Sequence, residues 1–220
     1  KDISVRIPMG KVTAIIGGNG AGKSTVFKLL TRLYEPTSGK IEFHEDNIAD
    51  YNVTQWRDRF AYVFQKNPLV SGTVRENLTY GLDREVSDEE LIEVTKKANC
   101  YDCIMSKPEG FNEDVGLDGS NFSGGQGQCI SIARAMLRDA DYLLLDEATS
   151  NLDVISEAMV TEALNHLMEN KTTIMIAHNY AATQNADNII VMRDGRIEAS
   201  GTPGEMLAHN EYYQLFSKNL

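Results

Sequence analysis

The chain has 220 residues, and its 32 acidic side chains outnumber its 21 lysines and arginines, which gives a formal net charge of −11. Hydrophobic residues make up 42% and charged residues 24%, close to globular averages, so the composition excludes a disordered or fibrous protein. The length suits one large domain or one domain with a sizeable insertion. The acidic balance argues against broad binding to nucleic acid or to an anionic membrane, so a polyanionic ligand would be bound locally by a few groups.

Signals for targeting and for disulfides are weak. No apolar run approaches the roughly 18 residues that a membrane span needs, and the first ten residues lack the pattern of a signal peptide. The chain has no initiator Met and begins inside a strand-like pattern, so we expect it to be an N-terminally truncated piece of a longer protein. Cys100, Cys103 and Cys129 include one CxxC pair without a second pair, which favours reduced thiols over a zinc site.

Strand and helix patterns alternate through the first part of the chain. The short apolar segment 12–16 predicts a buried strand, and a glycine-rich turn then opens a helix that runs to about Leu33, ahead of Pro36. Shorter strands are expected at 40–43 and 60–64. Such alternation is typical of a mostly parallel sheet flanked by helices.

The middle of the chain, from about 67 to 133, has a helical pattern. Ser87 and Glu90 form the pattern of a capping box that opens a helix to about Ala98. Ser123 and Gln126 form the same pattern at the start of a helix to about Leu137.

Strand patterns return after this helical segment. Strands are expected at 142–145, 172–176, 188–193 and 197–200, with Asp194-Gly195 as the hairpin turn between the last two. A capping box from Thr202 to Glu205 opens a further helix, with Pro203 at its first position. The sequence therefore predicts an α/β core formed by residues 1–66 and 134–220 and a helical insertion at 67–133.

A phosphate-binding loop is predicted directly after the first strand. Residues 17–24, GGNGAGKS, match the pattern GxxxxGKS/T between a strand and a helix, which is the context that this motif requires. Glycines let successive backbone N–H groups surround a phosphate, and the helix N-terminus adds its positive dipole end. Lys23 would supply a mobile charge for the β- and γ-phosphates, and the Ser24 hydroxyl could bind Mg²⁺.

Two carboxylates follow the predicted strand 142–145. Asp146 and Glu147 come at its carboxyl end, where open α/β sheets bind their ligands. Adjacent carboxylates are costly to bury unless a cation or a reacting water meets them. Asp146 would hold Mg²⁺ through water, and Glu147 would orient or deprotonate the water that attacks the γ-phosphate.

The helix that Ser123 caps begins with two glycines, Gly124 and Gly125. Each glycine costs a helix about 1 kcal/mol, which is reasonable where a phosphate must approach the backbone closely. One nucleotide cannot easily contact two helix N-termini of a compact domain. The pattern therefore favours a second copy of the domain in a head-to-tail arrangement.

Taken together, six motifs in order resemble those of the nucleotide-binding domain of ABC transporters, from the phosphate loop to about residue 205. Residues 17–25 resemble the Walker A motif and residues 143–147 the Walker B motif with its catalytic glutamate. Residues 122–126, FSGGQ, resemble the LSGGQ signature. Gln65 resembles the Q-loop glutamine, residues 150–153 the D-loop, and His178 the switch histidine. Segments 71–77 and 114–119 resemble those of exporters rather than importers.

The resemblance implies a P-loop NTPase core with a helical signature subdomain that acts as an ATPase. It implies catalytic roles for Glu147, His178, Lys23 and Gln65, and Mg²⁺ binding by Ser24, Gln65 and Asp146. The residues implied to contact the nucleotide are Gly17, Asn19, Gly20, Ala21, Gly22, Lys23, Ser24, Thr25, Ser123, Gly124, Gly125, Gln126 and Asp153.

The implied partners are a second nucleotide-binding domain, identical or related, and a fused or associated transmembrane domain, with no nucleic acid. Two MgATP would lie between two domains in head-to-tail contact, and hydrolysis would open this dimer and move the attached membrane helices. The domain would therefore work at the cytoplasmic face of a cell membrane, although an isolated copy would be soluble.

The sequence departs from the family pattern at several positions. Leu117 stands where the loop that contacts the membrane domain usually has a glutamate, and Phe122 replaces the signature leucine. Other departures are Gly127, Cys129, Asn179 and Tyr180. The tyrosine that stacks on adenine would lie upstream of residue 1. Base stacking is worth about 1–3 kcal/mol, so we expect ATP binding to be weaker by about tenfold or more.

Three other functions stay open on the sequence alone. A soluble cassette ATPase acting on nucleic acid or ribosomes usually carries two cassettes or a long coiled-coil insertion, and this chain shows neither. A nucleotide-gated binding module with little hydrolysis is disfavoured by Glu147 and His178. A P-loop kinase would leave residues 123–126 unexplained.

Overall fold

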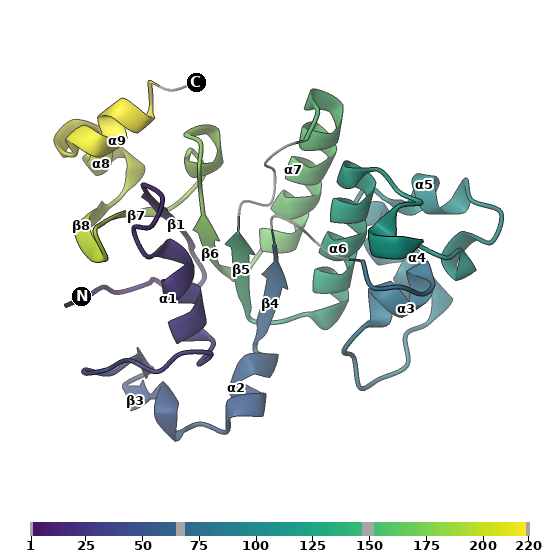
Figure 1. Cartoon of the computed structure of the whole chain (residues 1–220), viewed down its shortest axis with the longest axis horizontal. Helices are drawn as coiled ribbons and strands as arrows, with labels where there is room; N and C mark the ends of the chain where they lie inside the picture. Colours follow the sequence, from purple (N-terminus) through teal and green to yellow (C-terminus); the bar gives the residue numbers. More distant parts are fainter. Residues whose placement is uncertain (1, 65–68, 147–151, 219–220) are drawn as a thin grey trace. The chain divides into compact units, whose positions relative to one another are not determined.

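The computed structural model describes residues 2–64, 69–146 and 152–218 and divides the chain into two compact units (Figure 1). The first unit comprises Lys1–Ala61, Asp141–Glu147 and Asn170–Leu220, and the second comprises Tyr62–Ala140 and Ala148–Glu169. These units differ in extent from the predicted division into 1–66 with 134–220 and 67–133, which stays a prediction.

Six strands form a mostly parallel sheet in the order β4-β5-β6-β1-β7-β8. The strands are β1 Val12–Gly17, β4 Phe60–Val63, β5 Tyr142–Asp146, β6 Thr172–Ile176, β7 Asn188–Arg193 and β8 Arg196–Gly201. The pairs β5–β6, β6–β1 and β1–β7 are parallel, whereas β7 and β8 are antiparallel. The predicted α/β fold class, a P-loop core built on a mostly parallel sheet, is therefore confirmed.

The apolar run that predicts β1 places that strand in the middle of the first unit. Ala14, Ile15 and Ile16 are at most 1% exposed, as expected for a strand with neighbours on both sides and covered faces. Helix α8 (Pro203–His209) and helix α9 (Glu211–Phe216) contribute Met206 and Tyr213 to the same core. This core holds the end of β1, and therefore the start of the phosphate loop, in a fixed position.

Helix α1 (Lys23–Leu30) ends earlier than the predicted Leu33. Arg32 adopts a left-handed conformation with φ 54°, and the N–H groups of the next two residues both donate to Lys28 O. This turn ends the helix before the proline is reached. Side chains of helix α2 (Val53–Asp58) bind carbonyl groups at the C-terminus of α1. Trp56 Nε1 donates to Leu30 O at 2.7 Å, and Arg57 Nε donates to Thr31 O at 3.0 Å.

The two hairpins of the first unit have positive φ at both turn residues. His44 and Glu45 join β2 (Glu42–Phe43) to β3 (Asp46–Asn47), so only the end of the predicted strand 40–43 pairs. Asp194 and Gly195 join β7 to β8 as predicted, with φ 52° and 77°. Turns of this kind match the twist of the strands they connect.

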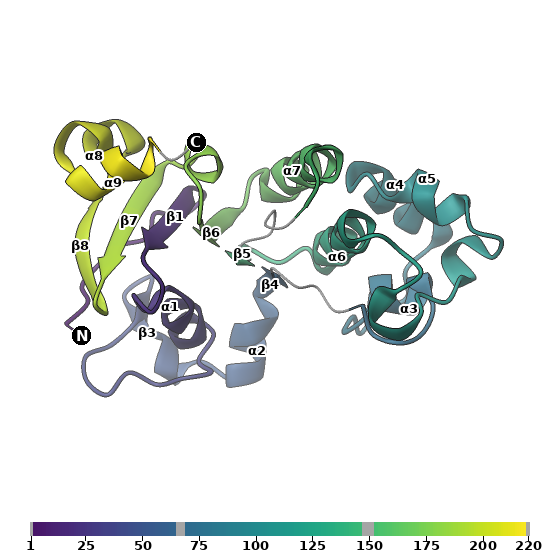
Figure 2. The same cartoon turned by 45° about the horizontal axis from the view of Figure 1, so that its top comes forward.

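The second unit is helical, and its helices are α3 Val74–Thr79, α4 Asp88–Lys97, α5 Tyr101–Met105, α6 Gly124–Arg138 and α7 Val154–Met168. Short 3-10 helices lie at Ile48–Asp50, Gly110–Asn112, Leu117–Gly119 and Ala181–Thr183. Within the second unit α6 and α7 lie side by side, and α3 and α4 also pack against α6 (Figure 2). The helices predicted after Ser87 and after Ser123 are confirmed.

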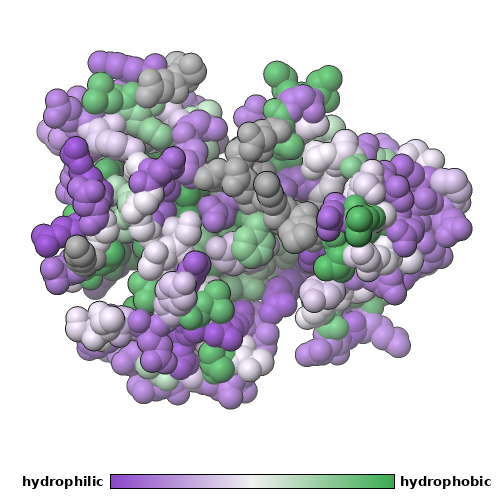
Figure 3. Space-filling model, viewed as in Figure 1, coloured by the Kyte–Doolittle hydropathy of each residue, from purple (hydrophilic) through white to green (hydrophobic). Residues whose placement is uncertain are grey.

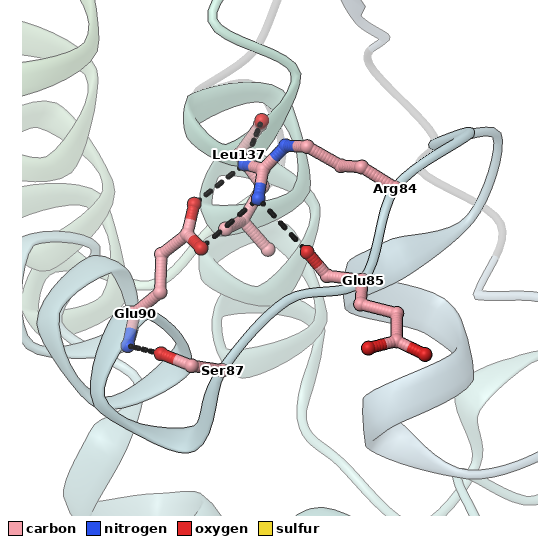
Figure 4. Close-up of polar contacts among 5 residues, drawn as sticks. All are labelled: Arg84, Glu85, Ser87, Glu90 and Leu137. Carbon is pink, nitrogen blue, oxygen red and sulfur yellow. Dashed lines mark hydrogen bonds and ion pairs between the residues drawn. The ribbon is translucent and has the colours of Figure 1, made fainter.

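The capping boxes predicted at Ser123 and Thr202 are fully formed, but the one at Ser87 is half formed. Ser87 Oγ accepts the N–H of Glu90 at 3.2 Å. The Glu90 carboxylate is bound by Arg84, whose guanidinium also donates to Leu137 O at the end of α6 (Figure 4). The hydrogen bond from Arg84 lowers the pKa of the Glu90 carboxyl below its ordinary value.

The face shown in Figure 3 is mostly hydrophilic, and its hydrophobic residues lie in small separate groups. This distribution agrees with the globular composition of the sequence, in which 24% of the residues are charged. Across the described ranges, no helix combines the length and the apolar character needed to cross a membrane.

Candidate nucleotide site

The loop between β1 and α1 is shaped by glycines with positive φ: 152° at Gly17, 77° at Gly20 and 101° at Gly22. Only glycine adopts such conformations readily. Gly22 is the N-cap of α1 and offers no side chain to cap the first turn, which also contains no acidic residue. An anion can therefore approach this N-terminus without meeting a side-chain oxygen of the cap or of an acidic residue in the first turn.

Packing against β7 explains why residue 17 must be glycine. A Cβ atom at Gly17 would lie 2.2 Å from the backbone oxygen of Met192, closer than atoms can pack. Gly18 and Gly20 differ, because a Cβ at either position would meet no atom within 4 Å. The start of the loop, at Gly17, thus packs closely against β7. The rest of it, at Gly18, Asn19 and Gly20, is exposed.

Lys23 lies against the loop that precedes it. Its Nζ donates to Gly17 O at 2.8 Å and to Gly18 O at 3.1 Å, and the residue is only 7% exposed. Ser24 and Thr25 follow it in the first turn of α1 and are exposed, and Ala21 is buried. A phosphate bound here would offer the ammonium charged acceptors, which form stronger hydrogen bonds than neutral carbonyls do.

The sheet brings two further predicted site residues to the same edge as the loop. In register, Asp146 at the end of β5 pairs with Ile176 of β6, and Ile15 of β1 pairs with Ile176 from the other side. Gly17 therefore lies two residues beyond this level on β1, and His178 lies two residues beyond it after β6. His178 is exposed and Asp146 is half-buried, so both are accessible from solvent. The arrangement is that of a ligand site at the carboxyl ends of parallel strands.

The donor set at this edge fits a hard divalent cation. Ser24 and Asp146 contribute a hydroxyl and a carboxylate, which are the oxygen ligands that Mg²⁺ prefers. Among the residues that the structure describes, no group of three or more His, Cys, Asp or Glu side chains could hold a metal ion. A cation bound by this hydroxyl and this carboxylate would complete its coordination with phosphate oxygens and water, as Mg²⁺ in nucleotide sites does.

Two predicted catalytic residues, Gln65 and Glu147, lie outside the described residues, as do Ser150 and Asn151 of the predicted D-loop. Their roles stay predictions.

The predicted signature residues gather at the start of α6 in the second unit. Ser123 Oγ accepts Gln126 N at 3.3 Å, and Gln126 Oε1 accepts Ser123 N at 3.0 Å. Ser123 and Gly124 are exposed, whereas Gly125 is buried. A Cβ at Gly125 would lie 2.5 Å from Ser156 Cβ on α7, so close packing between the helices requires this glycine. The contact with Ser156 is a second reason for glycine at 125, and the approach of a phosphate to Gly124 and Gly125 stays a prediction.

Asp153 is the N-cap of α7. Its carboxylate accepts the N–H groups of Ile155 and Ser156 at 3.1 Å and the Ser156 hydroxyl at 2.6 Å. These hydrogen bonds, the hydroxyl first, lower the pKa of the Asp153 carboxyl. Sequence reasoning did not single out Ser156. A small hydroxyl residue three positions after a capping aspartate is the signal that could have indicated it.

The geometry of the phosphate loop agrees with the protein family that this sequence matches. A family model described as "ABC transporter" matches residues 1–150. The chain belongs to the ABC transporter family. The resemblance recognised in the sequence motifs is thereby confirmed, and the segment that carries the phosphate loop is the ATP-binding domain of this family.

Three curated relatives define this relationship further. The "Uncharacterized ABC transporter ATP-binding protein y4gM" of Sinorhizobium fredii is 43% identical over 214 residues, 97% of this chain and 36% of the relative. The "ATP-dependent lipid A-core flippase" of Xylella fastidiosa is 45% identical over 204 residues, 93% of this chain and 35% of the relative. The "Leptomycin B resistance protein pmd1" of Schizosaccharomyces pombe is 42% identical over 216 residues, 98% of this chain and 16% of the relative. The chain thus spans at most 36% of the length of these relatives.

The departures from the ABC pattern occupy two kinds of position. Phe122 is 8% exposed, and Lys107 Nζ lies 5.1 Å from its ring centroid, so the larger ring is packed within the domain. Leu117 is 77% exposed, next to Asp118 with φ 52°. The first substitution changes internal packing, whereas the second changes the surface.

The cysteines of this ABC domain are reduced. Cys100 and Cys129 are buried, and Cys103 is half-buried. Burial raises the pKa of the Cys129 thiol to about 12 and also raises that of Cys103. The raised pKa values favour the protonated thiol over the thiolate.

Proposed function

We propose that this chain binds and hydrolyses MgATP as the nucleotide-binding domain of an exporter. Two domains would meet head to tail around two nucleotides and drive transport through fused or associated transmembrane domains at the cytoplasmic face of a membrane. The observation that carries the proposal is the open phosphate loop, with Lys23 held against it and Asp146 and His178 at the same sheet edge. Relatives named as a flippase and as a resistance protein support the exporter assignment.

Nucleotide binding would use charge and backbone N–H groups supplied by one short segment. The N-terminus of α1 and the exposed part of the loop would surround the β- and γ-phosphates. Lys23 would exchange its bonds to Gly17 O and Gly18 O for phosphate oxygens. Mg²⁺, held by Ser24, Asp146 and Gln65, would neutralise charge on the phosphates.

Hydrolysis would transfer the γ-phosphoryl group to water. Glu147 would accept the proton of the attacking water as the new oxygen–phosphorus bond forms and the bond to the bridging oxygen of ADP breaks. His178 would steady the γ-phosphate, and Gln65 would orient the water. Little else is asked of the protein, because positioning and charge stabilisation dominate phosphoryl transfer.

The start of α6 would act on the nucleotide of the other domain. Ser123 already accepts the N–H of Gln126, and its O–H remains chemically able to donate to a phosphate oxygen. Exposed Gly124 would let that phosphate approach the backbone. Asp153 binds Ser156, which lies close to Gly125 at this end of α6. Asp153 would therefore transmit the closure of the dimer.

The proposal is tested with Glu147→Gln in this chain, at millimolar MgATP. We expect ATP binding to persist while turnover falls by about 10²–10⁴-fold, the usual contribution of a positioned acid–base group. Sedimentation should reveal an ATP-dependent dimer of this variant.

Two matched variants serve as controls. Adding Ser123→Arg to Glu147→Gln should abolish the dimer without preventing ATP binding, whereas adding Lys23→Ala should prevent both. Near-normal turnover of Glu147→Gln would remove the glutamate from its role. A dimer that survives Ser123→Arg would contradict the head-to-tail arrangement.

A further inference from the structure

Helices α6 and α7 approach each other closely at their first turns. A Cβ atom built at Gly125 would lie 2.5 Å from Ser156 Cβ, 2.6 Å from Ser156 Oγ and 3.4 Å from Ser156 Cα. The first two distances are shorter than any real contact of a Cβ atom, and they involve the short, stiff side chain of a helical serine. No rotation of Ser156 removes the clash with its own Cβ, so the two backbones can approach this closely only with glycine at 125.

Ser156 is itself fixed by the residue that begins α7. Its hydroxyl donates to Asp153 Oδ2 at 2.6 Å, and its N–H donates to Asp153 Oδ1 at 3.1 Å. Both the backbone and the side chain of Ser156 are therefore tied to the N-cap. A charge-assisted O–H···O⁻ bond of this length is among the stronger hydrogen bonds of proteins.

The neighbouring glycine provides an internal comparison. A Cβ at Gly124 would have Leu152 Cδ2 at 3.9 Å as its nearest neighbour, which is an ordinary van der Waals contact. Gly124 is exposed and Gly125 is buried. The two glycines therefore differ in purpose: packing against Ser156 demands the second, while the first faces solvent.

We propose that Ser156 is a positioning residue of the nucleotide site. Held by Asp153, it sets the distance between α7 and the first turn of α6 and so fixes where Ser123 and Gly124 present themselves to a phosphate. The effect on nucleotide binding rests on the proposed function, whereas the contact between α6 and α7 is independent of it. A displacement of Asp153 would move Ser156 through their two hydrogen bonds, and with it the atoms that leave no room for a Cβ at residue 125.

The test is a set of substitutions in the Glu147→Gln chain. Gly125→Ala should displace α6 from α7, lower the unfolding midpoint by roughly 3–10 °C, and abolish the ATP-dependent dimer. Gly125→Ala with Ser156→Gly removes both clashing atoms and leaves the 3.4 Å contact to Cα, so we expect the dimer to return and the midpoint to rise toward that of Ser156→Gly alone.

Two single variants are the controls. Gly124→Ala adds the same methyl group one residue earlier and should keep the unfolding midpoint. Ser156→Ala keeps the Cβ contact but loses the hydroxyl bond to Asp153. We expect it to fold normally and to form the dimer at a higher ATP concentration, because the position of α6 is less well defined.

The outcomes separate the two proposals. A double variant whose midpoint recovers while its dimer does not would show that Gly125 is needed at the phosphate, and would overturn the positioning role of Ser156. A Gly125→Ala chain that behaves like its parent would overturn it too. If the parent Glu147→Gln chain bound ATP without dimerising, the proposed function would fail. The midpoints would still decide the contact: recovery in the double variant would support it, and no recovery would refute it.

Discussion

The N-termini of α1 and α6 are both expected to face phosphate, yet they are built in opposite ways. Helix α1 begins at a left-handed glycine that supplies no side-chain cap. Helix α6 begins at Ser123, which forms a complete capping box with Gln126. Two of the N–H groups at this start, those of Ser123 and Gln126, are thus already bound by side chains.

The other ends of the same two helices are alike. Side-chain donors bind carbonyl groups in the last turn of both helices. Trp56 donates to Leu30 O of α1, and Arg84 donates to Leu137 O of α6. An uncapped helix start is costly for a protein in the absence of a ligand, because its first N–H groups have no partners within the helix. The loop before α1 has the features of a primary anion site, whereas α6 can add a hydroxyl and one open glycine to an anion bound elsewhere.

The largest expected effect comes from disrupting the packing of Gly17, at the start of the phosphate loop, against Met192 of β7. Gly17→Ala would place Cβ 2.2 Å from Met192 O at a φ of 152°, so we expect a loss of about 3 kcal/mol or more in the free energy of unfolding, measured with urea. Gly18→Ala is the matched control, because its Cβ meets nothing within 4 Å, and it should stay within about 0.5 kcal/mol of the parent. Equal stability of the two variants would refute the close approach to β7.

A smaller effect would separate the two roles of Ser123. Ser123→Ala removes the cap and should cost about 1 kcal/mol of stability. Ser123→Asp keeps a good N-cap and should preserve stability, but it places a negative charge where a phosphate is expected, so ATP-dependent association should disappear. Thermal unfolding and sedimentation measure the two effects independently. A Ser123→Asp chain that still associated with ATP would mean that α6 does not face the nucleotide.

The smallest effect concerns the far end of α6, where Arg84 binds both Glu90 and Leu137 O (Figure 4). The pKa of Glu90 is lower in the folded chain than its ordinary value of 4.5, so the folded state binds fewer protons there. The stability from this pair is complete above about pH 4.5 and is lost as the pH falls through the lowered pKa. The loss should be small, because the pair is exposed.

Glu90→Gln checks this effect. The variant should be slightly less stable than the parent at pH 7, and the difference should vanish below the lowered pKa in acid unfolding curves. A difference that persists at low pH would show that the carboxylate charge is irrelevant at the end of α6.

Local patterns in the sequence predicted those parts of the molecule that depend on local chemistry. The phosphate loop, the hairpin at Asp194 and the capping boxes at Ser123 and Thr202 are all present. Each of them is formed by residues that are close in the sequence. The strands were predicted in the same way, because their apolar runs are short and continuous.

Features set by a backbone turn, by a competing side chain or by a neighbouring helix escaped prediction. The box at Ser87 is incomplete because Arg84 competes for Glu90, and α1 stops early because Arg32 turns left-handed. The reason for Gly125 lies on another helix, at Ser156, so no pattern around residue 125 could disclose it. The roles of the site residues stay predictions, whereas the contacts that hold Lys23 and Asp153 became visible only in the structure.

The position of β1 between β6 and β7 has a consequence for synthesis of the chain. Both sheet neighbours of the strand that carries the phosphate loop come from the second half of the sequence, and Val12 N–H donates to Asp187, 175 residues later. The ribosome adds about 5–20 residues per second, so β1 waits roughly ten seconds or more for its partners to emerge. A nascent chain that ends before residue 188 would lack β7 and with it Met192, the residue against which Gly17 is seated. The proposed binding of phosphate would therefore become possible only after β7 has been synthesised and has joined the sheet.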